Sequence, residues 1–202
     1  DPVLSAAMAT AECEGIYEYN LYPFIKHFAL NDQEINRNGM LCTWTTEQAM
    51  REIYLKPFER CIKESGSNPI TVMSSYNYIG TTWAGANPEL LNTVLRDEWG
   101  FRGMVLTDYF GNYGYMDADK AVRGGSDIML ATAGNDAIMT DTTSATSVLA
   151  MRQACKNIMY TMVNSYTYET YDPNAISGWV RTFYIVDAIG IVALVAAEAA
   201  LI

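Results

Sequence analysis

The feature that most constrains the fold is an alternation of short apolar runs, rich in β-branched residues, with longer helical patterns. Four runs are expected to form strands, at residues 24–30, 70–77, 103–109 and 126–130. Their continuous apolar character is typical of strands that are covered on both faces. Strands that alternate with helices at this spacing predict an α/β fold built on a parallel sheet.

The spacers between these runs carry helix start and stop signals. "TTEQAMREIYLKPFERCIKES" begins at a cap, Thr45 or Thr46, and Pro57 is expected to break or kink it. The next helix is expected to have Asn87 as its cap and Gly100 at its end. Three further stretches also predict helices: "LSAAMATAECEGIY", "MDADKAVRGG" and "TSATSVLAMRQACKNIMYTMVNSY".

Residues 182–202 are different in kind, because the segment is apolar and long enough to cross a bilayer, which takes about 20 residues. Trp179 and Tyr184 suit a membrane interface. Asp187 and Glu198 count against insertion, each costing up to ~3 kcal/mol at the helix centre and less near an end. The alternative is a buried or tail helix of a soluble protein.

These patterns divide the chain into an α/β domain over residues 1–176 and a transmembrane or hydrophobic tail helix over residues 177–202. A membrane-associated or cell-surface location is expected, with the cytoplasm left open. The chain starts at Asp1 without a signal peptide, and its first residues have the pattern of a helix already under way. We therefore expect it to begin partway through a larger protein.

Composition excludes several partners. The net charge of −10 and the lack of a basic cluster argue against nucleic acid and fit a small neutral or cationic ligand better. The four cysteines share no CxxC spacing and the chain has a single histidine, so zinc is not expected. The thiols are expected to be mostly buried, with one disulfide possible; they are Cys13, Cys42, Cys61 and Cys155.

Chemically active side chains stand at the carboxyl ends of the expected strands. They are Lys26 and His27, then Tyr76, then Asp108. Each has an ordinary explanation: a surface lysine, a structural histidine, or an aspartate that caps the next helix. In a (β/α)₈ barrel, however, such positions point into the active site. Two cations, a phenol and a carboxylate there could hold a polyhydroxyl ligand against a nucleophile.

Three segments resemble the catalytic barrel of family 3 glycoside hydrolases, in its β-glucosidase branch. They are "KHFALNDQEINR", "VMSSYNYIGTTWAGANPELLNTVLRDEWGFRGMVLTDY" and "AVRGGSDIML", and the resemblance spans residues 13–165 in the family's order. Residues 29–31, Ala-Leu-Asn, replace the Pro-Gly-His usual in the N-acetylhexosaminidase branch. The resemblance implies a partial (β/α)₈ TIM-type barrel of about four βα units, where a full barrel has eight and takes about 250 residues.

The resemblance also implies roles for individual residues. Asp108 falls on the nucleophile that forms a covalent glycosyl-enzyme. Tyr76 falls on the aromatic residue beside it, and Tyr109 stands where many relatives carry Trp at the entrance subsite. The residues that fall on those binding the sugar hydroxyls in the innermost subsite are Lys26, His27 and Arg37.

The implied function is a retaining, exo-acting β-glucosidase that acts on a small β-glucoside or oligosaccharide without a cofactor. Its acid/base glutamate is expected on a sandwich domain which, with the other barrel half, is expected upstream of this chain. Asp117 and Asp119 lie near the nucleophile but are interpreted as helix-start residues. The alternatives are a non-catalytic, membrane-tethered sugar-binding or vestigial barrel fragment and, more distantly, an aldolase with Lys26 as Schiff base.

Overall fold

The computed structural model describes residues 1–19, 21–64, 71–132, 137–166 and 172–201. The chain forms two compact units, Asp1–Tyr168 and Glu169–Ile202. The first unit is an α/β domain, and the second contains helix α7, Gly178–Leu201. Residues 65, 70 and 202, at the ends of an expected helix, strand and tail, lie outside the described residues.

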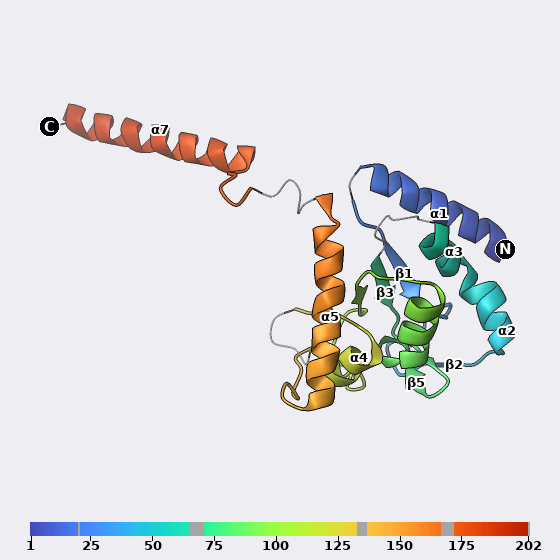
Figure 1. Cartoon of the computed structure of the whole chain (residues 1–202). Helices are drawn as coiled ribbons and strands as arrows, with labels where there is room; N and C mark the ends of the chain where they lie inside the picture. The colour runs from blue at the N-terminus through green and yellow to red at the C-terminus, as the bar shows by residue number, and fades with distance from the viewer. Residues whose placement is uncertain (20, 65–70, 133–136, 167–171, 202) are drawn as a thin grey trace. The chain divides into compact units, whose positions relative to one another are not determined.

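Three parallel strands form the central sheet, in the order β1–β3–β6 (Figure 1). The strands are β1 (Phe24–Phe28), β3 (Thr71–Ser74) and β6 (Val105–Leu106). Val72 in the central strand pairs with Ile25 on one side and Val105 on the other. The predicted parallel arrangement is therefore confirmed for the first three apolar runs, although each strand is shorter than its run.

The fourth predicted strand, at residues 126–130, is wrong as a regular strand. A single parallel bridge joins Leu106 to Ile128. Asp127 and Ile128 both donate their backbone N–H groups to Val105 O, at 2.8 and 3.1 Å, which does not follow the ladder of a regular pair. The segment still runs beside β6, because the Thr107 N–H donates to Ile128 O at 2.9 Å.

A second small sheet lies beyond the end of β3 and was not predicted. It contains β2 (Cys42–Thr43), β4 (Tyr78–Ile79) and β5 (Thr82–Trp83), with β2 parallel and β5 antiparallel to β4. Strands of two residues are too short to show an alternating pattern in the sequence. The Trp83 indole N–H donates to Ser75 O at 2.9 Å and so ties this sheet to the end of β3.

The helices follow the predicted signals closely. Thr46, Asn87 and Asp117 each accept a hydrogen bond from a backbone N–H three residues on, at 3.2, 3.1 and 2.9 Å, as helix caps do. Helical structure is interrupted between Tyr54 and Lys56, just before Pro57, as expected. The helical elements of the first unit are α1 (Pro2–Glu18), α2 (Glu47–Ala49), η1 (Met50–Tyr54), α3 (Lys56–Glu64), η2 (Ala84–Ala86), η3 (Glu89–Glu98), α4 (Ala118–Gly124) and α5 (Ala145–Val163).

One apolar core holds the central sheet against its helices. Val72 and Val105 from the sheet and Leu91 and Leu95 from η3 are fully buried in it, and Phe28 closes it at the end of β1. A side chain of this size stabilises the fold by about 1.5–3 kcal/mol when it is fully buried. Because this core fixes the sheet, it also fixes the positions of the strand ends.

The cysteines depart partly from expectation. Cys13 on α1 and Cys61 on α3 are buried where these helices pack together, whereas Cys42 and Cys155 are exposed. All four are free thiols, so the possible disulfide is not formed. Cys42 lies in a two-residue strand of the small sheet and Cys155 on α5, and neither residue belongs to a core cluster.

Candidate active site

The candidate site lies where the three parallel strands end. His27 is the second-last residue of β1, Tyr76 follows β3 by two positions, and Asp108 follows β6 by two positions. Because the strands are parallel, their carboxyl ends meet at one edge of the sheet. The predicted convergence of these three positions on one edge is therefore present in the structure.

Side-chain hydrogen bonds to the end of β1 orient the segment that carries Tyr76. The neighbouring Ser75 and Asn77 are fully buried, and both side chains donate to Ala29 O, at 3.1 Å each. The Asn77 amide also donates to Thr43 Oγ1 at 3.1 Å. Since both flanking side chains are anchored to the end of β1 in this way, the segment between them has a fixed conformation.

Asp108 is a buried carboxylate with positive charge beside it. Its Oδ1 accepts the Tyr109 backbone N–H at 2.8 Å, and its Oδ2 accepts Arg37 Nη1 at 3.4 Å. His27 Nε2 lies 3.6 Å from the same Oδ2, slightly beyond a hydrogen bond. Asp108 does not cap a helix, because the next helix begins at Ala118 with Asp117 as its cap. The helix-cap interpretation of Asp108 is therefore wrong.

Arg37 connects three groups of the site. Its Nε binds Glu34 Oε1 at 3.0 Å, while its Nη1 reaches Asp108. The guanidinium carbon lies 4.8 Å from the centre of the Tyr76 ring, which is a cation–π distance. The planar guanidinium is thus fixed on two sides and above a ring, which orients it toward the carboxylate.

His27 is held mainly as the neutral imidazole. Burial lowers its pKa below the usual range, and the charges of Lys26 and Arg37 lower it further, while Asp108 opposes them. A neutral imidazole has one N–H donor and one acceptor nitrogen, which suits a ligand hydroxyl that both gives and takes a hydrogen bond.

Tyrosines form the wall beside Arg37. Burial raises the pKa of Tyr76, and the nearby Asp108 charge and a hydrogen bond with Tyr113 raise it further, so its hydroxyl keeps its proton. Tyr113 meets the Tyr76 ring edge-on at 5.5 Å and stacks on Tyr115 at 6.4 Å. The Tyr115 hydroxyl donates to Tyr76 O at 3.0 Å.

Sequence reasoning missed three of these residues, namely Glu34, Tyr113 and Tyr115. The two tyrosines carried a usable signal, since "NYGYMD" places aromatic residues at alternate positions soon after a strand that ends in a carboxylate. Glu34 carried none, because an exposed glutamate in a turn resembles any other surface charge.

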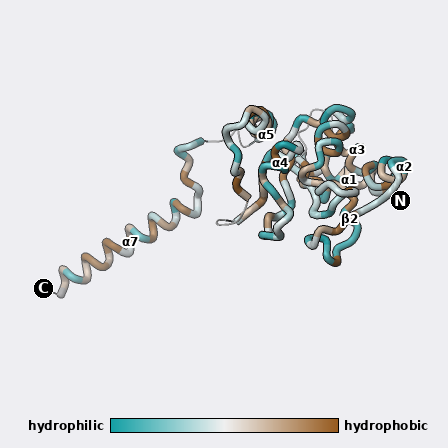
Figure 2. Tube along the Cα trace, turned by 90° about the horizontal axis from the view of Figure 1, so that it is seen from below, coloured by the Kyte–Doolittle hydropathy of each residue, from teal (hydrophilic) through white to brown (hydrophobic). Residues whose placement is uncertain are grey.

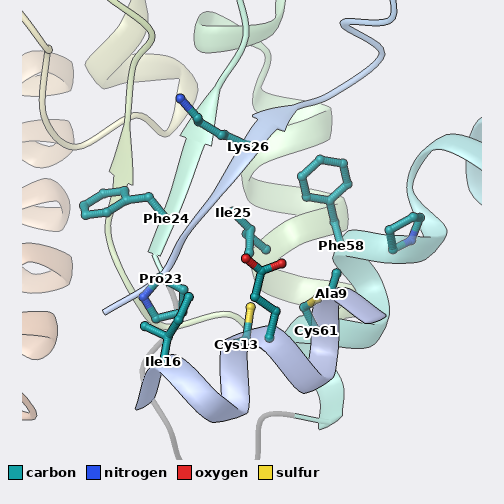
Figure 3. A pocket seen from close by; sticks show the side chains of 11 residues that line it. Ala9, Cys13, Ile16, Pro23, Phe24, Ile25, Lys26, Phe58 and Cys61 are labelled. Carbon is teal, nitrogen blue, oxygen red and sulfur yellow. The ribbon is translucent and has the colours of Figure 1, made fainter. Parts of the chain in front are cut away.

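Lys26 does not contact Asp108, contrary to the expected convergence. It is exposed, and its side chain makes no hydrogen bond or ion pair within the part of the chain that the structure describes. It lies at the rim of a cavity of about 310 Å³ between α1, β1 and α3, on whose far side Cys13 and Cys61 lie (Figure 3). Without a carboxylate to hold it, the ammonium group stays in solvent, close enough to His27 to lower its pKa.

Tyr109 stands at the rim of the site. Its backbone N–H donates to Asp108, but the residue is 37% exposed and its hydroxyl shares a 2.9 Å hydrogen bond with Thr132 Oγ1. This position fits the predicted place at an entrance, while the role itself stays a prediction. Among the described residues, no group of three or more His, Cys, Asp or Glu side chains is placed to hold a metal ion.

A buried carboxylate flanked by an arginine, a histidine and tyrosines, at the carboxyl edge of a parallel sheet, is the kind of site that hydrolytic α/β enzymes use. The N-terminal domain of glycosyl hydrolase family 3 matches residues 1–165, and the chain belongs to this family.

Relatives in the family carry β-glucosidase names. The chain is 41% identical to probable beta-glucosidase J of Emericella nidulans over 121 residues. This match covers 60% of this chain and 14% of that protein. It is 45% identical to a beta-glucosidase of Rhizobium radiobacter over 113 residues. This second match covers 56% of this chain and 13% of that protein.

Solved structures agree in fold. Beta-glucosidase 3B from Thermotoga neapolitana in complex with alpha-D-glucose matches with a TM-score of 0.69 and 30% identity, over 86% of this chain and 26% of that one. The Bifidobacterium adolescentis GH3 beta-glucosidase matches with a TM-score of 0.71 and 25% identity, over 88% of this chain and 26% of that one. The chain therefore spans between 13% and 26% of the length of these four relatives.

Proposed function

We propose that this chain is the nucleophile-bearing part of a retaining, exo-acting β-glucosidase, which releases terminal β-D-glucosyl residues from small β-glucosides or oligosaccharides. The observation that carries the proposal is the approach of Arg37 Nη1 and His27 Nε2 to one oxygen of the buried Asp108, at 3.4 and 3.6 Å. The β-glucosidase names of the relatives, and the glucose in one related structure, support the substrate class.

In the proposed reaction, an Asp108 carboxylate oxygen attacks the anomeric carbon of the glucosyl unit. The bond from that carbon to the leaving-group oxygen breaks, and the leaving oxygen takes a proton from a general acid. Water then attacks the same carbon and releases Asp108, with the acid, now a base, removing the water's proton. Two inversions give net retention.

The other groups bind and orient the sugar. Arg37 offers N–H donors beside the carboxylate, and the neutral His27 and the protonated Tyr76 can each bond a hydroxyl of the same sugar. Lys26 would bind a further sugar hydroxyl, and Tyr109 would line the approach of the leaving group. No step of this scheme needs a metal or a cofactor.

The proposal also concerns parts outside this chain. The three-stranded parallel sheet with a fourth bridged segment is taken as about half of a (β/α)₈ barrel. The remaining strands, and a sandwich domain that carries the acid/base glutamate, are expected upstream. This chain alone is then expected to be nearly inert on cellobiose, because general acid catalysis contributes about 10² to 10⁴ in rate.

A trapping experiment on the complete parent protein tests the nucleophile. An activated 2-deoxy-2-fluoro β-glucoside should attach to the peptide that contains Asp108, as seen by mass spectrometry, and Asp108→Asn should abolish the label. Asp117→Asn is the matched control, since Asp117 caps α4 and should not affect labelling.

Three results would contradict the proposal. Labelling on another residue, or full turnover by Asp108→Asn, would remove Asp108 from the nucleophile role. Binding of glucose by the complete protein without any labelling or turnover would instead support a non-catalytic, vestigial barrel.

A further inference from the structure

Helix α7 presents apolar side chains that nothing in its own unit covers. Ten large apolar or aromatic residues from Trp179 to Val195 are each more than half exposed. The stretch Gly178–Ala200 is long and apolar enough to cross a membrane, and none of its apolar window is buried. Water is a poor solvent for so much contiguous apolar surface, so the helix requires a partner.

The apolar surface surrounds α7 and is not restricted to one face. Successive residues of a helix are about 100° apart, so the exposed Val186, Ile191 and Val192 point in three directions that are roughly 100° to 140° apart. Apolar colours accordingly recur along the whole helix (Figure 2). A helix that lies on a membrane surface has one charged face, whereas a helix that is apolar all round is buried in a core or spans a bilayer.

We propose that α7 spans a lipid bilayer, with Thr182–Leu201 in the hydrocarbon. These 20 residues extend about 30 Å at about 1.5 Å per residue, which equals the typical hydrocarbon thickness. Trp179 and Arg181 then fall just outside the hydrocarbon at one end. Tryptophan is enriched at that depth, and an arginine there extends its charge to the headgroups.

This placement also accommodates the two acidic residues. Asp187 comes five positions after Thr182, about 7.5 Å inside one boundary, and Glu198 three positions before Leu201, about 4.5 Å inside the other. Neither carboxylate lies at the bilayer centre, where the cost of a charge is greatest. Side-chain extension and local thinning of the bilayer reduce the cost near the boundaries. The inference does not depend on the proposed glycosidase activity.

The test uses the full chain, synthesised without cells in the presence of liposomes of phosphatidylcholine and phosphatidylglycerol. The chain should float with the vesicles and resist extraction at alkaline pH. Replacing Ile191 and Leu194 together by Lys should lower the extraction-resistant fraction by about 10-fold or more, because each lysine is strongly unfavourable at mid-bilayer. The matched control replaces Leu4 and Met8 on α1 by Lys; these residues are 59% and 66% exposed. This control should leave the extraction-resistant fraction unchanged.

A labelling experiment separates spanning from surface binding. In Ile191→Cys, a membrane-impermeant maleimide should not reach residue 191 until detergent is added, while the exposed Cys42 and Cys155 react at once on chains outside the vesicles. The proposal fails if alkaline extraction removes the wild-type chain or both lysine pairs reduce binding equally. It also fails if residue 191 reacts in intact vesicles or the chain sediments without lipid as an aggregate.

Discussion

Arg37 and Asp108 are separated by 71 positions in the sequence, yet Arg37 Nη1 lies 3.4 Å from Asp108 Oδ2. The contact joins the turn after β1 to the end of β6, with the central strand β3 lying between them in the sheet. It exists only because the three strands run parallel and end at the same edge. The site therefore depends on the apolar core that holds the strands in register.

The single histidine allows this cluster to be measured directly. In an NMR titration of the His27 imidazole, we expect a midpoint below pH 6.5, because burial disfavours the charged form. Arg37→Gln should raise the midpoint, since it removes a nearby positive charge, and Asp108→Asn should lower it further, since it removes the opposing negative charge. A midpoint that neither variant moves would show that the three groups do not interact in solution.

The same lowered pKa predicts how stability depends on pH. The unfolded chain binds a proton at His27 near pH 6.5, whereas the folded chain binds it only at lower pH, so protonation favours unfolding in that window. The contribution of His27 to stability should be complete above pH 6.5 and be lost as the pH falls toward the folded pKa. The free energy of unfolding, measured with urea in mild detergent, should therefore depend less steeply on pH in His27→Gln than in the wild type. Parallel pH profiles would contradict this.

A buried ion pair fixes the segment that runs beside β6. Asp127 accepts Arg96 Nη2 and the Val105 N–H on Oδ2, at 2.8 and 2.7 Å, and Asn157 Nδ2 on Oδ1 at 2.8 Å. Its side chain is 2% exposed. Asp127→Ala should lower the free energy of unfolding by about 3–5 kcal/mol, because it leaves a guanidinium without its partner.

An exposed pair on the same domain provides the control. Arg51 binds Glu98 at 2.7 Å, but both side chains are about 40% exposed, so Arg51→Gln should cost no more than about 1 kcal/mol. Thermal unfolding in mild detergent compares the two variants. Equal losses would mean that burial does not set the value of the Asp127 pair.

The elements that the sequence predicted well are those with a strong local signal. Caps at Thr46, Asn87 and Asp117 depend on one side chain and a nearby backbone, and all three are in place. The second sheet and the irregular segment at residues 126–130 depend on contacts with distant segments, which no local pattern encodes. Asp127 is an example, since its partners lie 22 to 31 positions away.

For the site, strand-end position was the useful guide. It located His27, Tyr76 and Asp108 because parallel strands deliver their last residues to one edge. Lys26 makes no contact with Asp108 among the described residues, and its role in sugar binding stays a prediction. Glu34 could not be found, since its significance comes only from Arg37.

The four thiols should divide into two classes. Cys42 and Cys155 are exposed and should react rapidly with a maleimide, whereas Cys13 and Cys61 are buried and should react at least 10-fold more slowly. The thiol of Cys13 donates a hydrogen bond to Cys61, which lowers the pKa of Cys61 to about 7. The same hydrogen bond raises the pKa of Cys13. Of the slow pair, Cys61 should therefore react first at neutral pH, because the thiolate is the reactive form. Peptide mass spectrometry after timed labelling measures this, and faster reaction at Cys13 would contradict it.

Arg37 should matter more to turnover than Tyr109, although both residues border Asp108. This expectation rests on the proposed function and applies to the complete parent protein. Arg37→Lys keeps the charge but loses the planar donor set that reaches Asp108 and Glu34 together, so kcat/KM on an aryl β-glucoside should fall by about 10- to 150-fold. Tyr109→Phe removes only the hydroxyl contact with Thr132 and keeps the ring and the backbone bond, so its effect should stay within about 5-fold. The ordering is measured by steady-state kinetics, with unfolding curves to confirm that both variants fold. If Tyr109→Phe were the more damaging change, the hydroxyl at the rim, and not the arginine beside the carboxylate, would be the group that the substrate needs.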